Sequence, residues 1–164
     1  MIILGIDHGT QRIGYGAIQA EGNMLSLLDA GLLRIRTKDS TKALHEIKQE
    51  MDNLLERYHP EVVAVERLYF ANNQKTAIAV AQARGVILLA ATEHNTAIVE
   101  LSPTEIKTGL TGYGSSDKKA VLKMVRLILR KPSLEVIDDA SDALASAIVA
   151  HKHNRVAART QERA

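Results

Sequence analysis

The sequence predicts an α/β domain with a mixed five-stranded sheet. Short apolar segments that end at turn residues indicate the strands, which come first along the chain and then alternate with helices. The chain has 164 residues, close to the length of about 150 residues expected of one domain. Its composition, 46% hydrophobic and 24% charged, is typical of a globular protein and excludes a disordered chain.

Three of the predicted strands open the chain. Residues 2–6 form an apolar run, and residues 13–18 and 24–35 follow with Gly and Asn between them. This spacing predicts an antiparallel meander. Two further apolar runs, at 61–66 and 96–101, complete the predicted sheet.

The first two predicted helices differ in character. Ser40 or Thr41 can cap an amphipathic helix, which the His59-Pro60 pair stops. Residues 74–92 are small or apolar on nearly every face, which is typical of a helix that is buried all round. In so small a domain such burial requires a second copy of the chain, so we expect a homodimer.

The last third of the chain predicts further helices. Residues 103–107 predict a helical turn, and residues 110–117 predict a Gly/Ser loop. Ser116 then caps a basic helix, and Asp138 or Asp139 caps the final helix.

Charge is distributed unevenly along the chain. The net charge is +2, but residues 102–131 carry +5 and residues 151–164 carry +3, which leaves −6 for the rest. A basic segment and a basic tail on an acidic body indicate a polyanionic partner bound on one side. The alternative is that Lys123, Arg126 and Arg130 only solvate the outer face of a helix.

Several classes of protein are excluded by composition. The sequence has no cysteine, which excludes a disulfide scaffold, a zinc–thiolate site and a cysteine nucleophile. Its apolar runs are shorter than the roughly 20 residues that a membrane helix needs, and its first residues lack the features of a signal peptide. We therefore expect a cytoplasmic protein with no membrane contact.

Four acidic side chains stand out by their positions. Asp7 and Glu66 each end an apolar strand, near the low-dielectric edge of the sheet, where an unpaired charge is costly. Asp139 and Asp142 are spaced i, i+3 on the first turn of the last helix, whose neighbouring Ala and Ser residues allow close packing on the sheet. That packing predicts an oxygen-only site, which suits Mg²⁺ or Mn²⁺ rather than zinc.

Each of these acids also has a purely structural alternative. The two helix acids could only complement the helix dipole. Glu66 could pair with Arg67 or Arg84, and Asp7 could begin a turn with Gly9.

With these motifs the sequence resembles the RuvC family of Holliday junction resolvases, which are crossover junction endodeoxyribonucleases. The resemblance rests on five segments that occur in the family's order and spacing: GIDHGTQRIGYG (5–16), VAVERLYF (63–70), AQARGV (81–86), LSPTEIKTGLTGYGSSDKKAV (101–121) and DASDALASAI (139–148). It implies a single RNase H-like nuclease domain over residues 1–152. We expect residues 153–164 to form a basic, flexible tail.

The resemblance assigns the metal-binding acids of the family to Asp7, Glu66, Asp139 and Asp142. On spacing alone, Asp138 competes with Asp139 for this role. These acids are expected to hold two Mg²⁺ ions per site, with Mn²⁺ able to substitute.

DNA-contacting positions also carry over from the resemblance. The aromatic residue that stacks on a base matches Tyr69, with Phe70 beside it. The DNA-contacting lysines match Lys107 and Lys118, with Lys119 adjacent, and Lys118 is expected to act in catalysis as well. One departure is His8, at a position that is commonly Pro in the family, so that His8 could reach a phosphate or have no role.

The reaction implied by the resemblance is resolution of four-way DNA junctions in recombination and repair. A homodimer would make paired symmetric nicks in strands of like polarity by two-metal-ion hydrolysis, leaving a 5′-phosphate and a 3′-hydroxyl. The resemblance further implies cooperation with the RuvAB branch-migration complex.

Three other functions fit parts of the sequence. Actin-like ATPases and sugar kinases have a similar phosphate loop, but they need two such domains, and this chain has the length of one. A YqgF-type RNase H-like nuclease acting on RNA has a related start but lacks the long basic region and the aromatic pair. A non-catalytic junction-binding protein would gain nothing from carboxylates that face phosphates.

Overall fold

The computed structural model describes residues 1–68 and 74–161, and the side chains of residues 1–68 and 77–154. The strands of this part of the chain are β1 (Ile2–Asp7), β2 (Arg12–Glu21), β3 (Met24–Arg34), β4 (Val62–Glu66) and β5 (Ala97–Leu101). The helices are α1 (Ser40–Tyr58), α2 (Gln74–Glu93), α3 (Pro103–Thr111), α4 (Lys118–Ile128) and α5 (Asp138–Gln161).

The strands form one mixed sheet in the order β3-β2-β1-β4-β5. Strands β1, β2 and β3 are antiparallel neighbours, whereas β4 runs parallel to both β1 and β5. The predicted meander and the predicted mixed five-stranded sheet are therefore confirmed. Because β1 and β4 are parallel neighbours, their carboxyl ends lie at the same edge of the sheet.

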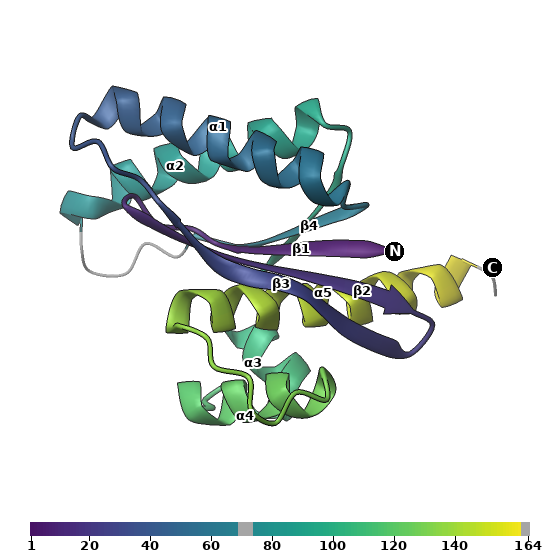
Figure 1. The fold of residues 1–164 in the computed structure, drawn as a ribbon. Coiled ribbons are helices and arrows are strands. Elements are labelled where there is room, and N and C mark those ends of the chain that lie inside the picture. The colour runs from purple at the N-terminus through teal and green to yellow at the C-terminus, as the bar shows by residue number, and fades with distance from the viewer. Residues whose placement is uncertain (69–73, 162–164) are drawn as a thin grey trace.

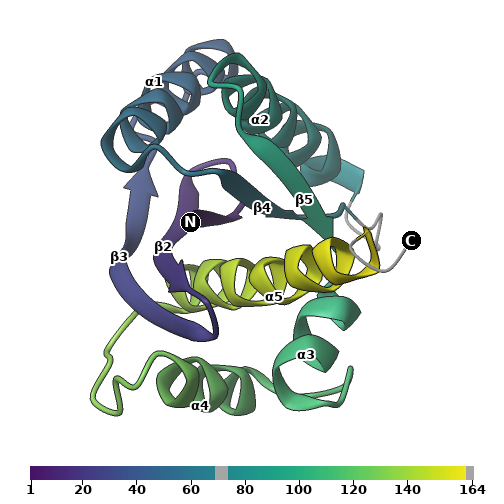
Figure 2. The same cartoon turned by 90° about the vertical axis from the view of Figure 1, so that its right-hand side faces the viewer.

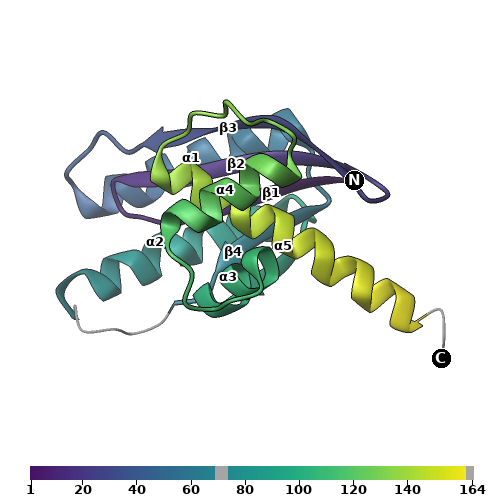
Figure 3. The same cartoon turned by 90° about the horizontal axis from the view of Figure 1, so that it is seen from below.

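Helices cover both faces of the sheet, giving three layers (Figures 1 and 2). Helices α1 and α2 lie on one face, and α5 lies across the other with α3 and α4 outside it (Figure 3). Side chains of one strand alternate between the faces. Thus Ile3 belongs to the core beneath α5, while Leu4 and Ile6 belong to the core beneath α1 and α2.

Helix α5 lies in direct contact with the backbone of the central strands. A Cβ atom on Gly5 of β1 would lie 1.9 Å from the carbonyl oxygen of Ala143. A Cβ atom on Gly14 of β2 would lie 2.1 Å from the carbonyl oxygen of Asp139. Glycine in the strands and small residues in the helix therefore fix the first turn of α5 against one end of β1 and β2.

Two helix starts differ from the sequence prediction. Asp39, rather than Ser40 or Thr41, caps α1, since its carboxylate accepts a hydrogen bond from the backbone N–H of Lys42 at 2.9 Å. In α4 the capping residue is likewise an aspartate one position away from the predicted Ser116. A carboxylate is an acceptor as suitable as a hydroxyl, and its charge also complements the helix dipole.

The ends of the other helices refine the prediction further. Ser102 and Glu105 form a capping box, which starts a nine-residue α3 in place of the expected short turn. Helix α5 continues to Gln161, into the range expected to form a tail, so the boundary at 152 remains a prediction. In the described ranges, 1–68 and 74–161, the helices fall short of the length and apolar content required to cross a membrane.

In the single chain α2 is buried on one side only, so burial all round would require the predicted second copy. Ala83, Ile87 and Ala90 face the core, but Ile78 is 70% exposed and Leu89 is 53% exposed. The small residues of α2 allow it to pack beside α1, and its opposite face carries the exposed apolar side chains. The homodimer inferred from this helix remains a prediction.

The tight contact of α5 with the sheet can be tested by adding one methyl group. Gly5→Ala places its Cβ inside van der Waals range of the α5 backbone, so the free energy of unfolding should fall by about 3 kcal/mol or more. Gly85→Ala in α2 is the matched control, since nothing lies within 4 Å of the added Cβ, and it should change stability by less than about 1 kcal/mol. Urea unfolding measures both, and equal stabilities would contradict the packing described.

Candidate functional site: the acidic edge of the sheet

Four carboxylates from three elements lie at one edge of the sheet. Asp7 and Glu66 are the last residues of the parallel neighbours β1 and β4. Asp139 and Asp142 lie in the first turns of α5, whose backbone contacts Gly14 at the same edge. The structure therefore brings together the acids that the sequence singled out.

Asp7 is the electrostatic centre of this group. Its burial, followed by the carboxylates of Asp142, Glu66 and Asp139, raises the pKa of Asp7 from 3.8 to about 7, against a smaller opposing effect of Lys118. A carboxyl group shifted so far is destabilised in its charged form. Perturbation of this kind is typical of functional sites.

The neighbours of Asp7 show the same trend. Burial raises the pKa of Glu66 and that of Asp142, and the charge of Asp142 adds to the effect on Glu66. The proposed ion pairs of Glu66 do not form: the Arg84 guanidinium pairs with Glu100 and donates to the backbone carbonyl of Glu66. The structural alternative for Glu66 is therefore wrong with respect to Arg84.

The second candidate partner of Glu66 is also engaged elsewhere. Arg67 pairs with Glu105, with 3.6 Å between the guanidinium nitrogen and the carboxylate oxygen. Within residues 1–68 and 74–161, neither Asp7 nor Glu66 forms an ion pair through its carboxylate. Both therefore remain available to a cation from solution.

The two helix acids, in contrast, are paired with cations. Lys118 Nζ lies 3.3 Å from an oxygen of Asp142 and 3.6 Å from one of Asp138, and these carboxylates raise the pKa of Lys118. Arg12 lies 3.0 Å from Asp139. Lys118 was expected at the site from the sequence, whereas Arg12 was not singled out, because its approach to Asp139 depends on how α5 crosses β2.

The structure also separates the two adjacent aspartates of α5. Both aspartates raise the pKa of Asp142, but only Asp139 is also among the carboxylates that raise the pKa of Asp7. The side chain of Asp138 is 73% exposed. These observations favour Asp139 over Asp138 as the fourth member of the acidic group.

The chemistry of the group suits a hard divalent cation. Its donors are all carboxylate oxygens, which Mg²⁺ and Mn²⁺ prefer, and a cation would relieve the repulsion that raises the pKa of Asp7. In the described part of the chain, the acids are not gathered around one point in coordination geometry. Asp139 and Asp142 contact Arg12 and Lys118 instead.

The remaining predicted site residues lie around this group. Lys107 of α3 is close enough to lower the pKa of Glu66. Lys119 is exposed on α4 and, with Lys118 and Asp142, lines a small pocket of about 80 Å³ between α4 and α5. Tyr69 and Phe70 lie outside the described residues.

His8 lies next to the acidic group with its ring largely buried. Burial is the main cause that lowers the pKa of His8, so the neutral imidazole is favoured. Its Nε2 atom is buried and has no hydrogen-bond partner within the described residues. In this conformation His8 does not present Nε2 to a phosphate in solution.

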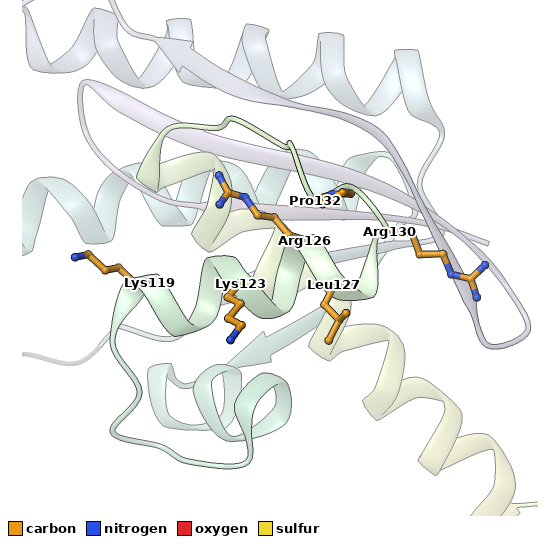
Figure 4. A pocket seen from close by; sticks show the side chains of 6 residues that line it. All are labelled: Lys119, Lys123, Arg126, Leu127, Arg130 and Pro132. Atoms are coloured by element: carbon orange, nitrogen blue, oxygen red, sulfur yellow. The ribbon is translucent and has the colours of Figure 1, made fainter.

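A basic groove runs along the outer side of α4 (Figure 4). Its volume is about 580 Å³, and its lining combines four cations with two apolar residues. The lining residues are Lys119, Lys123, Arg126, Leu127, Arg130 and Pro132. The groove starts at the end of α4 that carries Lys118 and leads away from the acidic group.

Comparison with known proteins identifies the family. The family model described as Crossover junction endodeoxyribonuclease RuvC matches residues 3–151. The chain belongs to the RuvC family. Crossover junction endodeoxyribonuclease RuvC of Natranaerobius thermophilus is 47% identical over 146 residues, which cover 88% of this chain and 91% of that protein. The membership and the endodeoxyribonuclease class expected from the motifs are thus confirmed.

Solved structures confirm the RNase H-like fold expected of a RuvC protein. The RuvC of Thermus thermophilus superposes with a TM-score of 0.88 at 29% identity, over 96% of this chain and 97% of that one. The same protein in complex with a Holliday junction substrate superposes with a TM-score of 0.85 at 28% identity, over 95% of this chain and 96% of that one.

The charge of Asp7 destabilises the folded chain, so a neutral residue at this position should stabilise the protein at high pH. Because the pKa of Asp7 is raised in the folded chain, ionising Asp7 destabilises the fold increasingly between the ordinary value of 3.8 and about 7. In EDTA at pH 8, Asp7→Asn should therefore raise the Tm by about 3–8 °C. The gain should shrink as the pH is lowered toward 4, because Asp7 of the folded chain is then protonated and no longer carries the unfavourable charge.

The control for this measurement is Asp138→Asn, which removes an exposed charge from the same helix end. Its Tm should stay within about 1–2 °C of the wild type. A lower Tm for Asp7→Asn at pH 8 would contradict the repulsion described at Asp7.

Proposed function

We propose that this chain is a metal-dependent endonuclease that resolves four-way DNA junctions. The observation that carries the proposal is the convergence of Asp7, Glu66, Asp139 and Asp142 at one edge of the sheet in a member of the RuvC family. Junction DNA is the substrate in the complex of the related Thermus thermophilus protein. The role is in DNA recombination and repair, in the cytoplasm.

The acidic group would hold two Mg²⁺ ions, or Mn²⁺ in their place. When bound, such ions lower the pKa of a coordinated water and stabilise charge on the leaving oxygen of the phosphodiester. Asp7 is the central ligand of the proposal, because the other three carboxylates act on it. Glu66 would bind metal from the side of β4, and Asp139 and Asp142 would bind metal from the side of α5.

Two lysines would assist at the scissile phosphate. Lys118 stands at the first position of α4, beside Asp142, and remains charged because neighbouring carboxylates raise its pKa. It can therefore neutralise charge that develops on the phosphate in the transition state. Lys107 acts from the Glu66 side and contacts the DNA backbone.

Binding of the junction arms would use the basic groove of α4. Its cations Lys119, Lys123, Arg126 and Arg130 line one groove along α4 and just beyond its end. Phosphate contacts of this kind give affinity without sequence information. The basic residues 153–164 would extend the same surface.

The junction itself would be recognised by symmetry and stacking. Tyr69 and Phe70 would stack on bases at the crossover, where such contacts contribute about 1–3 kcal/mol per base. A homodimer formed through the exposed face of α2, which carries Ile78 and Leu89, would present two acidic groups to the junction. This arrangement would produce paired symmetric nicks of like polarity, with 5′-phosphate and 3′-hydroxyl ends, in cooperation with RuvAB.

Loss of Asp7 should separate cleavage from binding. Asp7→Asn should reduce cleavage of a synthetic four-way junction in Mg²⁺ by at least about a thousandfold, because the central carboxylate is removed. Junction affinity in EDTA should stay within about threefold, since the basic surface is unchanged. Asp138→Asn is the control and should cleave at near the wild-type rate; normal cleavage by Asp7→Asn would exclude the assignment.

Charge reversal in the groove should lower the salt dependence of junction binding. Lys123→Glu with Arg130→Glu removes two phosphate contacts, so the slope of log K against log salt should become shallower by about two. Lys38→Glu with Lys42→Glu makes the same charge change near the start of α1, across the sheet from α4. If both pairs change the slope equally, the groove has no specific role in binding.

A further inference from the structure

Arg12 forms an ion pair with the acidic group from the side of β2. It is the first residue of β2, and its guanidinium lies 3.0 Å from an oxygen of Asp139. Two positions along the same strand, the backbone of Gly14 contacts the backbone of Asp139. The contact between β2 and α5 therefore holds the backbone of Arg12 near Asp139.

The pairing divides the four carboxylates into two kinds. Asp139 and Asp142 on α5 each have a cation, Arg12 and Lys118 respectively, whereas within the described residues Asp7 has none at ion-pair distance. The Arg12 side chain is 59% exposed, compared with 28% for Asp139. The carboxylate is thus partly buried, and the more exposed guanidinium can turn outward without disturbing the core.

We propose that Arg12 is a positioning residue that competes with the divalent cation for Asp139. The inference rests on the proposed function, in which Asp139 is a metal ligand. A guanidinium does not lose its proton at any relevant pH, so this competitor is permanent. Arg12 would balance the charge of Asp139 until a divalent cation binds Asp139 in its place. The displaced guanidinium would then face the bound DNA strand.

The competition predicts the direction of a change in metal affinity. A unit charge about 5 Å from a divalent ion repels it appreciably even in water, and salt reduces this effect. Replacing Arg12 by a neutral side chain should therefore tighten metal binding by about three- to tenfold. If Arg12 only held the fold together, its loss would weaken binding or leave it unchanged.

The test measures binding of Mn²⁺ to the DNA-free protein by calorimetry, in wild type, Arg12→Gln and Arg12→Lys. Arg12→Gln should bind Mn²⁺ about three- to tenfold more tightly, whereas Arg12→Lys, which keeps the charge, should stay within about twofold of the wild type. The matched control is Arg34→Gln, since Arg34 is the exposed cross-strand partner of Arg12 in β3. Its affinity should also stay within about twofold.

Asp139→Asn distinguishes failure of this inference from failure of the proposed function. Unchanged or weaker Mn²⁺ binding by Arg12→Gln, together with weaker binding by Asp139→Asn, overturns the role of Arg12 alone. Wild-type affinity in both variants overturns the metal role of Asp139 as well. Equal tightening in Arg12→Gln and Arg34→Gln would show a general charge effect and would also overturn the specific role of Arg12.

Discussion

The contact between α5 and the backbone of β1 and β2 is the constraint on which the rest of the structure depends. Gly5 and Gly14 leave no room for a side chain beneath the helix, so the first turn of α5 is held at one edge of the sheet. The same edge carries the ends of β1 and β4. Packing that stabilises the fold therefore also determines which acids meet.

Bringing these acids together opposes folding. Burial and mutual repulsion raise the pKa of Asp7 to about 7, and the fold bears this cost at neutral pH. A group of acids that destabilises the fold by mutual repulsion is typical of a functional site such as one that binds a cation. Two features reduce the cost within the chain: the pairing of Lys118 with Asp142 and that of Arg12 with Asp139.

The acidic group and the basic groove adjoin each other at the start of α4. Helix α4 starts beside the acidic group at Lys118 and continues as one wall of the basic groove (Figure 4). A DNA strand bound along the groove would thus lead toward the acidic group. In the sequence, the basic segment 102–131 lies between the last strand and the helix that supplies Asp139 and Asp142.

The sequence alone determined the strand order in the chain, the mixed sheet, the family and the four acids, because apolar runs and motif spacing are local features. It did not determine the caps, where neighbouring Ser and Asp residues are equally suited, nor the exposed face of α2, since composition does not show which sides pack. Only the tertiary structure decided the partners of the acids. Arg84 binds Glu100 instead of the Glu66 carboxylate, and Arg12 reaches Asp139, because ion pairs depend on how α5 and α2 lie on the sheet.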